Sequence, residues 1–219
     1  MPSLTTENYV KAIYQLSSRA ENAPVATGAV AQHLCVSPGS VTAMLKTLRD
    51  AELVQYERYE GVRLTTSGER LALRVVRRHR LIELFLSQTL DLSWDEVHEE
   101  AEHMEHAVSD RLIDRIDAYL GHPQSDPHGD PIPRSDGTVD DAEGTTLTQW
   151  PAGESFRIVR VLDQDSDFLR FLTDAGLELS SIGDVIDHTP QAATTTVRVS
   201  KRTTVLSEQV ADKLIVVSP

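Results

Sequence analysis

The dominant spacing of apolar residues differs between the N-terminal and C-terminal parts of this 219-residue chain, and that difference limits the folds the chain can adopt. Up to about residue 120, outside one short β-rich stretch, apolar side chains recur every three or four residues, which is typical of amphipathic helices. From residue 147 onward, short runs alternate between apolar and polar residues, as in strands. The segment between them, 121–147, is rich in Pro, Asp, Gly and Ser. The sequence therefore predicts a mainly α protein with a β C-terminal part, a small β-barrel, joined through a linker whose first half is ordered.

Three predicted helices and a hairpin make up the N-terminal part. Helical patterns cover 4–21, 27–34 and 40–51, and the turn CVSPGS joins the second helix to the third. Two β-rich runs then flank Glu60-Gly61 within 53–65. This order is typical of a winged helix-turn-helix, in which the third helix enters the major groove of DNA.

We predict DNA contacts from the start and the polar side of the third helix and from the hairpin. Small hydroxyl side chains at a helix start permit close approach to the duplex, and arginines on the wing would reach phosphates. The predicted contact residues are Ser37, Ser40, Thr42, Ala43 and Lys46 on the helix and Arg58 and Arg63 on the wing. The alternative is a winged helix that contacts another protein or acts as a spacer.

The net charge of −13 is distributed unevenly. Residues 1–80 contain 11 Lys and Arg against 7 Asp and Glu, a net of +4, whereas residues 81–219 contain 10 against 27, a net of −17. A basic N-terminal part on an acidic body is compatible with DNA binding confined to one module. An acidic surface also serves solubility or a salty cytoplasm, so the asymmetry only supports the DNA-binding interpretation.

Several features predict a soluble cytoplasmic protein. No apolar run approaches the ~18 residues that span a bilayer, and no basic segment followed by an apolar one marks a secretory signal at the N-terminus. The lone cysteine, Cys35, allows no internal disulfide.

Histidines and carboxylates concentrate on two predicted helices after the hairpin. The first covers 66–90 and carries His79 and Glu83 one turn apart. The second is predicted as one continuous helix from Ser93 to Gly121, with ligand-type residues at i, i+4, i+7 and i+8, namely His98, Glu102, Glu105 and His106. Facing helices that carry such side chains hold divalent metal ions. The alternative is a solvated, glutamate-rich face.

The second helix also carries an apolar stripe, formed by Val97, Ala101, Met104, Val108, Leu112, Ile116 and Leu120. A stripe of this kind packs on a partner, either within the chain or across a dimer. Symmetric regulators bind two DNA half-sites, so we predict a homodimer.

The motifs of common enzymes are absent. A zinc protease helix needs two histidines at i and i+4, but His98 and His103 are five residues apart and His103 and His106 are three apart. A Gly-rich phosphate loop, a nucleophile elbow and a CxxC motif are also missing. We therefore predict that the chain is not an enzyme.

Five stretches of the chain match one known family, namely TTENYVKAIYQL, VSPGSVTAMLKTL, RRHRLIELFL, WDEVHEEAEHMEHAVSDRL and DPHGDPIP. On these stretches the chain resembles the diphtheria toxin repressor family of metal-dependent transcriptional regulators nearly end to end. The resemblance implies a winged helix-turn-helix DNA-binding domain at 1–70, a helical metal-binding and dimerisation domain at 71–137, a linker at 138–147 and an SH3-like (FeoA-like) domain at 148–219. It also implies double-stranded operator DNA as the partner.

The resemblance further implies two metal ions per subunit. The family's ancillary site corresponds to His79, Glu83 and His98, and long members add ligands from the third domain, for which Asp165 and Asp167 are the candidates. The family's primary site corresponds to Asn8, Glu102, Glu105 and His106.

Oxygen donors at two of these positions favour manganese. Iron-sensing members have sulfur ligands where this chain has Asn8 and Glu102, and hard oxygen ligands suit Mn²⁺, with Fe²⁺ as the alternative. The resemblance is nearest the manganese transport regulator branch, which usually has Asp at the position of Asn8 and whose short members have Glu at that of Lys11.

These observations predict a manganese- or iron-dependent repressor of metal-uptake genes. The metal would neutralise carboxylates that otherwise repel each other, and it would hold the winged helix in a DNA-binding arrangement. The rival interpretation is a metal-buffering or structural helical protein whose winged helix mediates protein contacts.

Overall fold

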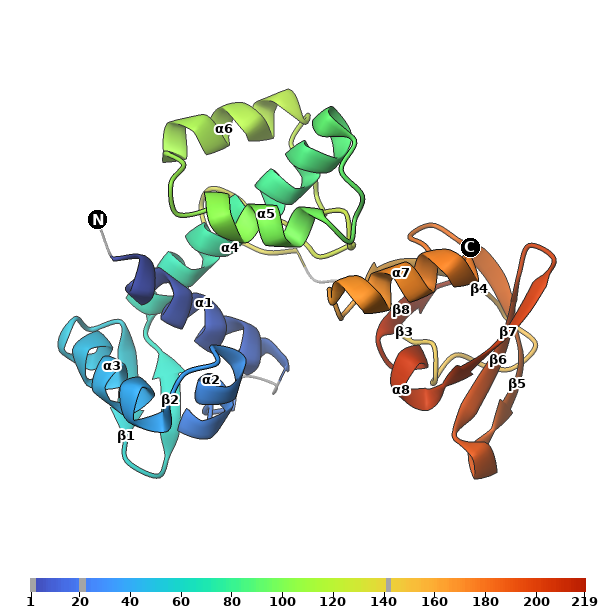
Figure 1. The fold of residues 1–219 in the computed structure, drawn as a ribbon, viewed down its shortest axis with the longest axis horizontal. Helices are drawn as coiled ribbons and strands as arrows, with labels where there is room; N and C mark the ends of the chain where they lie inside the picture. Colours follow the sequence, from blue (N-terminus) through green and yellow to red (C-terminus); the bar gives the residue numbers. More distant parts are fainter. Residues whose placement is uncertain (1–2, 20–22, 141–142) are drawn as a thin grey trace. The chain divides into compact units, whose positions relative to one another are not determined.

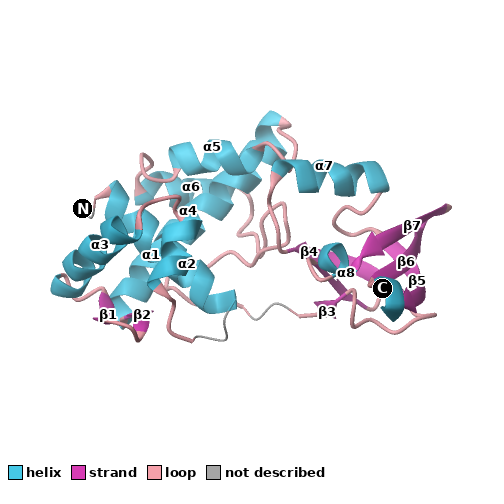
Figure 2. Cartoon of the chain, turned by 60° about the horizontal axis from the view of Figure 1, so that its bottom comes forward, coloured by secondary structure: helices cyan, strands magenta, loops and turns pink. Residues whose placement is uncertain are grey.

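The structure, a computed structural model, describes residues 3–19, 23–140 and 143–219 (Figure 1). The chain forms two compact units. Unit 1 contains Met1–His79, Glu105–Val108 and Pro133–Thr138, and unit 2 contains Arg80–Met104, Ser109–Ile132 and Val139–Pro219. Unit 1 is built of helices with one two-stranded hairpin, and the C-terminal part of unit 2 is built of strands flanked by short helices (Figure 2).

Unit 1 has the predicted order of three helices followed by a hairpin. Its elements are α1 (Leu4–Arg19), α2 (Thr27–His33), α3 (Pro38–Asp50), β1 (Val54–Glu57), β2 (Gly61–Leu64) and the first half of α4 (Thr66–Leu90). The core contains Val10 and Ile13 of α1 packed with Val41 and Leu45 of α3, all fully buried. This shared core makes α1 and the predicted recognition helix α3 parts of one packed body, and the winged helix-turn-helix is confirmed.

A tight glycine turn holds the wing against the rest of unit 1. Val25 and Val62 exchange two backbone hydrogen bonds of 2.9 Å, which attach β2 to the segment before α2. Gly61 lies beside this pair with φ +92°, and a Cβ there would lie 2.8 Å from the Val25 carbonyl oxygen. Only glycine meets both conditions without strain.

The prediction of one continuous helix from Ser93 to Gly121 is wrong. The structure has two helices, α5 (Val97–Met104) and α6 (Asp110–Tyr119). The Ser109 hydroxyl accepts a hydrogen bond from Leu112 N at 3.3 Å, and this N-cap starts a new helix. Glu105 and His106 therefore lie in the turn between the helices, and they no longer share a helix face with His98.

Unit 2 ends in a six-stranded antiparallel sheet with the order β3-β8-β4-β5-β6-β7. The strands are β3 (Thr145–Thr146), β4 (Ser155–Val161), β5 (Ile182–Thr189), β6 (Thr194–Val199), β7 (Arg202–Ser207) and β8 (Leu214–Val217). Three short helices accompany them, α7 (Ser166–Ala175), η1 (Pro190–Ala192) and α8 (Glu208–Ala211). Phe156 and Ile158 of β4 pack with Leu169 and Leu172 of α7 in a buried core. The predicted β character of the C-terminal part is confirmed.

Among the described helices, none combines the length and apolar content needed to cross a membrane.

Candidate metal centres

Unit 1 gathers buried and half-buried ligand-type side chains from three places in the sequence. Glu7 and Asn8 come from α1, His79 from α4, and Glu105 and His106 from the turn after α5. Glu105 is fully buried and Glu7 is 7% exposed. Buried carboxylates are uncommon unless they are paired or bind a cation, so these contacts define a candidate centre, called the α1 centre below.

One of the two carboxylate oxygens of Glu105 is already hydrogen-bonded. Its Oε2 accepts a hydrogen bond from Lys11 Nζ at 2.7 Å and lies 2.7 Å from His79 Nδ1. The lysine cation thus compensates the charge of Glu105 within unit 1. The expectation that all the carboxylates here repel each other does not hold for Glu105.

The Glu7 carboxylate also contacts a histidine and a cationic side chain. Its Oε2 lies 2.7 Å from His106 Nδ1, and its Oε1 lies 3.5 Å from Arg78 Nη1. The Nδ1 of His106 is therefore directed at Glu7, which leaves the other ring nitrogen for a different partner.

Three atoms of the α1 centre that could bind a metal ion have no hydrogen-bond partner, and we call them open. Asn8 Oδ1, Glu105 Oε1 and His106 Nε2 are buried and have no hydrogen-bond partner among the residues that the structure describes. The last two lie 3.2 Å apart. Buried polar atoms without partners are rare and costly. An amide oxygen, a carboxylate oxygen and an imidazole nitrogen fit Mn²⁺ or Fe²⁺ by the chemistry of their donors.

A second group lies within unit 2 and includes two residues that the sequence analysis did not name as ligands. Glu83 of α4 joins Asp126 and His128 from the DPHGDP loop, and all three side chains are buried. Each offers one ligand atom, and these atoms lie within 4.8 Å of one another. His128 Nδ1 is 3.8 Å from Glu83 Oε2 and 3.9 Å from Asp126 Oδ1. We call this group the loop centre.

Hydrogen bonds prepare both loop residues for a cation. His128 Nε2 lies 2.7 Å from the Trp94 carbonyl oxygen, which can only accept, so Nε2 carries a proton, and in the neutral ring Nδ1 has the lone pair that a metal ion needs. Asp126 Oδ1 accepts from the backbone N–H groups of His128 and Asp130 at 2.8 and 2.9 Å. In the described part of the chain, Asp126 Oδ2 and His128 Nδ1 have no hydrogen-bond partner.

The environment of Asp126 disfavours its charged form. Burial raises the pKa of this carboxyl well above its usual range, and the negative charges of Glu83 and Asp130 raise it further, against the opposing effect of Arg80. Arg80 Nε lies 3.6 Å from Asp126 Oδ2. A divalent cation would favour the deprotonated form, because metal ligands must lose their protons.

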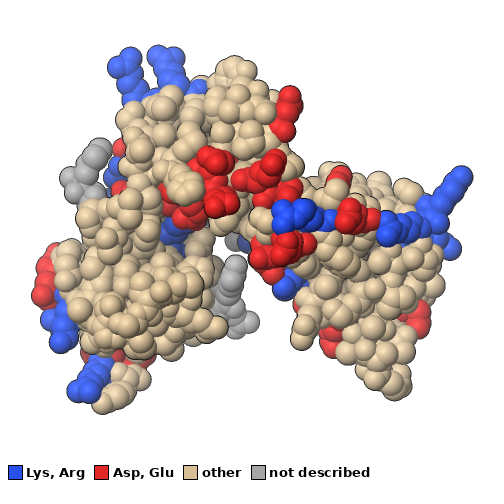
Figure 3. Space-filling model, viewed as in Figure 1, with Lys and Arg blue, Asp and Glu red and all other residues tan. Residues whose placement is uncertain are grey.

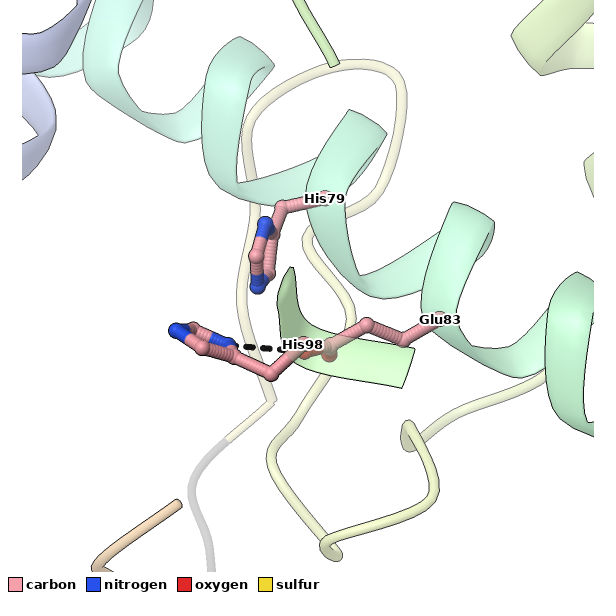
Figure 4. Close-up of side chains that lie close together, drawn as sticks. All are labelled: His79, Glu83 and His98. Atoms are coloured by element: carbon pink, nitrogen blue, oxygen red, sulfur yellow. Dashed lines mark hydrogen bonds and ion pairs between the residues drawn. The ribbon is translucent and has the colours of Figure 1, made fainter. Parts of the chain in front are cut away.

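His98 adds to the loop centre from α5. Its Nδ1 lies 3.1 Å from Glu83 Oε1, whereas the other oxygen of Glu83 is directed to His128. Figure 4 shows Glu83 extending from α4 toward His98, and it shows His79 one turn earlier on the same helix. His79 and Glu83 share one face of α4 because they are four residues apart.

The remaining predicted ligands lie as follows. Glu102 is on α5 one turn after His98, with 3.9 Å between its Oε1 and His98 Nε2. Asp165 is the N-cap of α7 and accepts from Phe168 N at 3.0 Å. Asp167 has a side chain that is 91% exposed and bonds Arg170 at 2.5 Å. The structure therefore gives Asp165 and Asp167 local roles in α7, and neither belongs to a ligand group among the described residues.

The predicted DNA-contacting residues lie on the surface of unit 1. Ser37 caps α3 by accepting from Ser40 N at 3.1 Å, and Thr42 donates to the Pro38 carbonyl oxygen at 3.0 Å. Ala43 and Lys46 are exposed on the same helix. The Ser37 hydroxyl thus caps the helix start, and the half-buried Thr42 hydroxyl is hydrogen-bonded within the helix.

The wing presents one residue that the sequence analysis missed. Tyr59 is 90% exposed at the turn of the hairpin, and the Arg58 guanidinium lies 4.9 Å from the centre of its ring. Arg63 is exposed on β2. Lys and Arg side chains protrude from the end of unit 1 that carries the hairpin (Figure 3).

Comparisons with known proteins match most of the chain in three parts. Residues 1–62 match the family model "Iron dependent repressor, N-terminal DNA binding domain", residues 65–134 match "Iron dependent repressor, metal binding and dimerisation domain", and residues 145–218 match "FeoA domain". The iron-dependent repressor IdeR of Mycobacterium tuberculosis is 32% identical over 185 residues, which cover 79% of this chain and 80% of that protein. This chain belongs to the iron-dependent repressor family.

Solved structures of other repressors share the fold. A manganese-dependent transcriptional repressor in complex with manganese is 38% identical, covers 98% of this chain and 100% of its own, and superimposes with a TM-score of 0.88. ScaR with bound Zn²⁺ is 30% identical with full coverage of both chains and a TM-score of 0.84. The diphtheria toxin repressor of Corynebacterium glutamicum is 31% identical over 193 residues, which cover 84% of each chain.

The sequence of this family member contained signals for the residues that were missed. Asp126 and His128 stand in DPHGDPIP, a stretch that carries the family resemblance and lies in the first, ordered half of the predicted linker 121–147. Glu7 and Lys11 lie one helical turn apart on α1 and flank Asn8. Their burial, unlike their spacing, depends on tertiary packing.

Proposed function

We propose that this iron-dependent repressor family member is a DNA-binding transcriptional repressor of metal-uptake genes, activated by Mn²⁺ with Fe²⁺ as the alternative. The observation that carries the proposal is the set of open buried atoms in the α1 centre, Asn8 Oδ1, Glu105 Oε1 and His106 Nε2. They belong to the same compact unit as the winged helix-turn-helix.

The donor set supports manganese. Oxygen and imidazole ligands without sulfur suit a hard divalent ion, and a similar solved structure is titled as a manganese-dependent repressor with manganese. Iron remains the alternative because other similar proteins are named iron-dependent repressors.

We further propose two ions per subunit. The α1 centre would hold one through Asn8, Glu105 and His106, with Glu102 as a further predicted ligand. The loop centre would hold the other through Glu83, Asp126, His128 and His98, with His79 as the predicted ligand from the preceding turn of α4. The buried oxygen of Asp126 and the lone pair of His128 Nδ1 support this enlarged set.

A bound ion would supply positive charge and fix the directions of its ligands. In the α1 centre, Asn8 would then be restrained against the turn that carries Glu105 and His106. Val10 and Ile13 of α1 pack in the same core as Val41 and Leu45 of α3. Restraint of α1 would therefore limit the positions that the recognition helix can take, and a change in that population is the basis of activation.

DNA would be bound by a homodimer whose two recognition helices enter successive major grooves. The contacts would come from α3 through Ser37, Ser40, Thr42, Ala43 and Lys46, and from the wing through Arg58 and Arg63, to which we add Tyr59. We also propose the domain limits 1–70, 71–137, 138–147 and 148–219. A cytoplasmic location follows from DNA as the partner.

The test is DNA binding in the presence of different metals. A gel shift with DNA from upstream of the protein's own gene or of metal-transporter genes would be titrated with Mn²⁺, Fe²⁺ and Zn²⁺. We expect Mn²⁺ or Fe²⁺ to promote the shift and the double variant Glu105→Ala, His106→Ala to lose the response. Binding that needs no metal would contradict the proposal.

The rival interpretation predicts a different result in the same assay. A metal-buffering protein whose winged helix contacts other proteins would bind Mn²⁺ without any shift of promoter DNA. The match of residues 1–62 to a DNA-binding domain model favours the repressor.

A further inference from the structure

A buried lysine lies among the ligand atoms of the α1 centre. Lys11 follows Glu7 by four residues and Asn8 by three, so all three side chains share one face of α1. The residue is only 4% exposed. Its Nζ lies 2.7 Å from Glu105 Oε2 and 3.2 Å from His79 Nδ1. A carboxylate oxygen, an atom type that binds a metal ion, here accepts a hydrogen bond from an ammonium group, and the same oxygen lies 2.7 Å from His79 Nδ1.

This arrangement balances charge without a metal ion. Of the two buried carboxylates of the centre, Glu105 pairs with Lys11 and Glu7 contacts Arg78. With neutral histidines, these four charged groups sum to zero. Buried charges are tolerated when they are paired and hydrogen-bonded, so the α1 centre can stay packed in the metal-free protein.

The two oxygens of Glu105 therefore have different environments. Oε2 is bound by the ammonium of Lys11, whereas Oε1 is buried and open, 3.2 Å from the open Nε2 of His106. An ion bound through Oε1 would leave the Lys11 pair intact. An ion bound through Oε2 and His79 Nδ1 would have to displace Nζ.

We propose that the Lys11 ammonium takes the place of a second metal ion in the α1 centre, restricts that centre to one ion and lowers its affinity for that ion. Lys11 has this role only if Glu105 and His106 bind metal, as proposed above. A positive charge held a few ångströms from a divalent ion in a buried site opposes binding, so Lys11 would raise the metal concentration needed for activation.

Two substitutions separate the charge from the shape of the side chain. Lys11→Met keeps a long stem without charge, and we expect the Mn²⁺ affinity of the α1 centre to rise at least about tenfold. Lys11→Glu adds a carboxylate, and we expect one more Mn²⁺ per chain than in the wild type. Lys11→Arg keeps the charge and should retain the wild-type count.

The readouts are metal binding and electron paramagnetic resonance, both without DNA. Isothermal calorimetry would give the count and affinity of Mn²⁺ in each variant. Two Mn²⁺ ions close together couple magnetically, so Lys11→Glu should broaden the six-line Mn²⁺ spectrum that isolated ions give. Lys201→Met is the matched control, because it removes the same charge from an exposed turn between β6 and β7.

Thermal unfolding in chelator and in Mn²⁺ shows whether each variant is folded. Lys11→Met should unfold at a lower temperature than the wild type in chelator, because Glu105 loses its cation, and Mn²⁺ should restore more stability to it than to the wild type. A variant that unfolds in both conditions is replaced by Lys11→Gln, which also removes the charge.

The outcomes distinguish this proposal from the proposed function. The role proposed for Lys11 is wrong if the uncharged variants and Lys11→Glu match the wild type in the number of bound Mn²⁺ ions and in affinity. It is also wrong if Lys11→Arg gains an ion. In both cases metal-dependent DNA binding stands. If the wild-type chain binds no Mn²⁺, both proposals fail.

Discussion

The pair formed by Lys11 and Glu105 allows the energetics of the α1 centre to be tested without any metal. Their charged atoms are 2.7 Å apart, Glu105 is fully buried and Lys11 is 4% exposed. Removal of one partner from a buried pair leaves an uncompensated charge, which typically costs about 3–5 kcal/mol, whereas removal of both partners together is often nearly neutral.

We therefore expect Lys11→Met and Glu105→Gln each to lower the free energy of unfolding of the metal-free protein by about 3 kcal/mol or more. The double variant should lose much less than the sum of the two, with a coupling of at least about 2 kcal/mol. Urea unfolding followed by circular dichroism, in chelator, would give the four free energies of the cycle.

Additive losses would refute this reasoning. They would mean that Lys11 and Glu105 do not compensate each other in solution and that the Glu105 carboxylate is balanced in another way. The Lys201→Met control should change the free energy of unfolding by less than about 0.5 kcal/mol, because it affects an exposed lysine.

Three further predictions concern the loop centre, the wing and the DNA surface. The pKa of Asp126 is raised in the metal-free fold, so the protonated form is favoured there, and stability is lost as pH rises from the ordinary Asp range through the raised pKa. Mn²⁺ binding should release this proton and should tighten as pH rises. Calorimetry in buffers of different ionisation enthalpy should show that the Asp126→Asn variant releases fewer protons on binding Mn²⁺ than the wild type. Gly61→Ala should lower the free energy of unfolding by about 1–3 kcal/mol, because Gly61 has a φ of +92° and a Cβ there would lie close to the Val25 carbonyl oxygen. Gly28→Ala is the control and should lower it by nothing, because the space around its Cβ is open; thermal unfolding would measure both variants. Lys46→Ala should weaken binding to all DNA sequences alike and reduce the slope of log affinity against log salt by about 1, with unchanged Mn²⁺ affinity; an unchanged slope would remove Lys46 from the interface.

The parts of the fold that local patterns control could be predicted from the sequence. The spacing of Val41, Leu45 and Leu48 gave α3 one buried face, and the alternation in SFRIVRV gave β4 its buried Phe156 and Ile158. In both cases the residue spacing itself determines which side chains face the core.

The break between α5 and α6 could not be predicted because the apolar spacing continues through it. Val97, Ala101 and Ile116 fit one helical stripe, yet Ser109 caps a separate helix. A serine inside a helical pattern can be a cap or an interior residue, and only packing decides between them. The error mattered because it placed Glu105 and His106 on the wrong element.

The full set of residues in the candidate centres could not be predicted from the sequence, because some of them meet only through tertiary packing. Residues at helical spacing, such as His79 and Glu83, could be grouped from the sequence. Asp126 and His128 reach Glu83 only because their loop folds back on α4, 43 and 45 positions later in the sequence. Nor could the sequence show that Lys11 would be buried beside Glu105.

The most direct test of the central claim is the affinity of fluorescently labelled promoter DNA for the wild-type chain, measured by anisotropy in chelator and in Mn²⁺. We predict that Mn²⁺ tightens binding at least about tenfold, within the range of allosteric coupling, and that His106→Gln, which lacks the open ring nitrogen, shows no such gain. Equal affinity of the wild-type chain in chelator and in Mn²⁺ would contradict the claim.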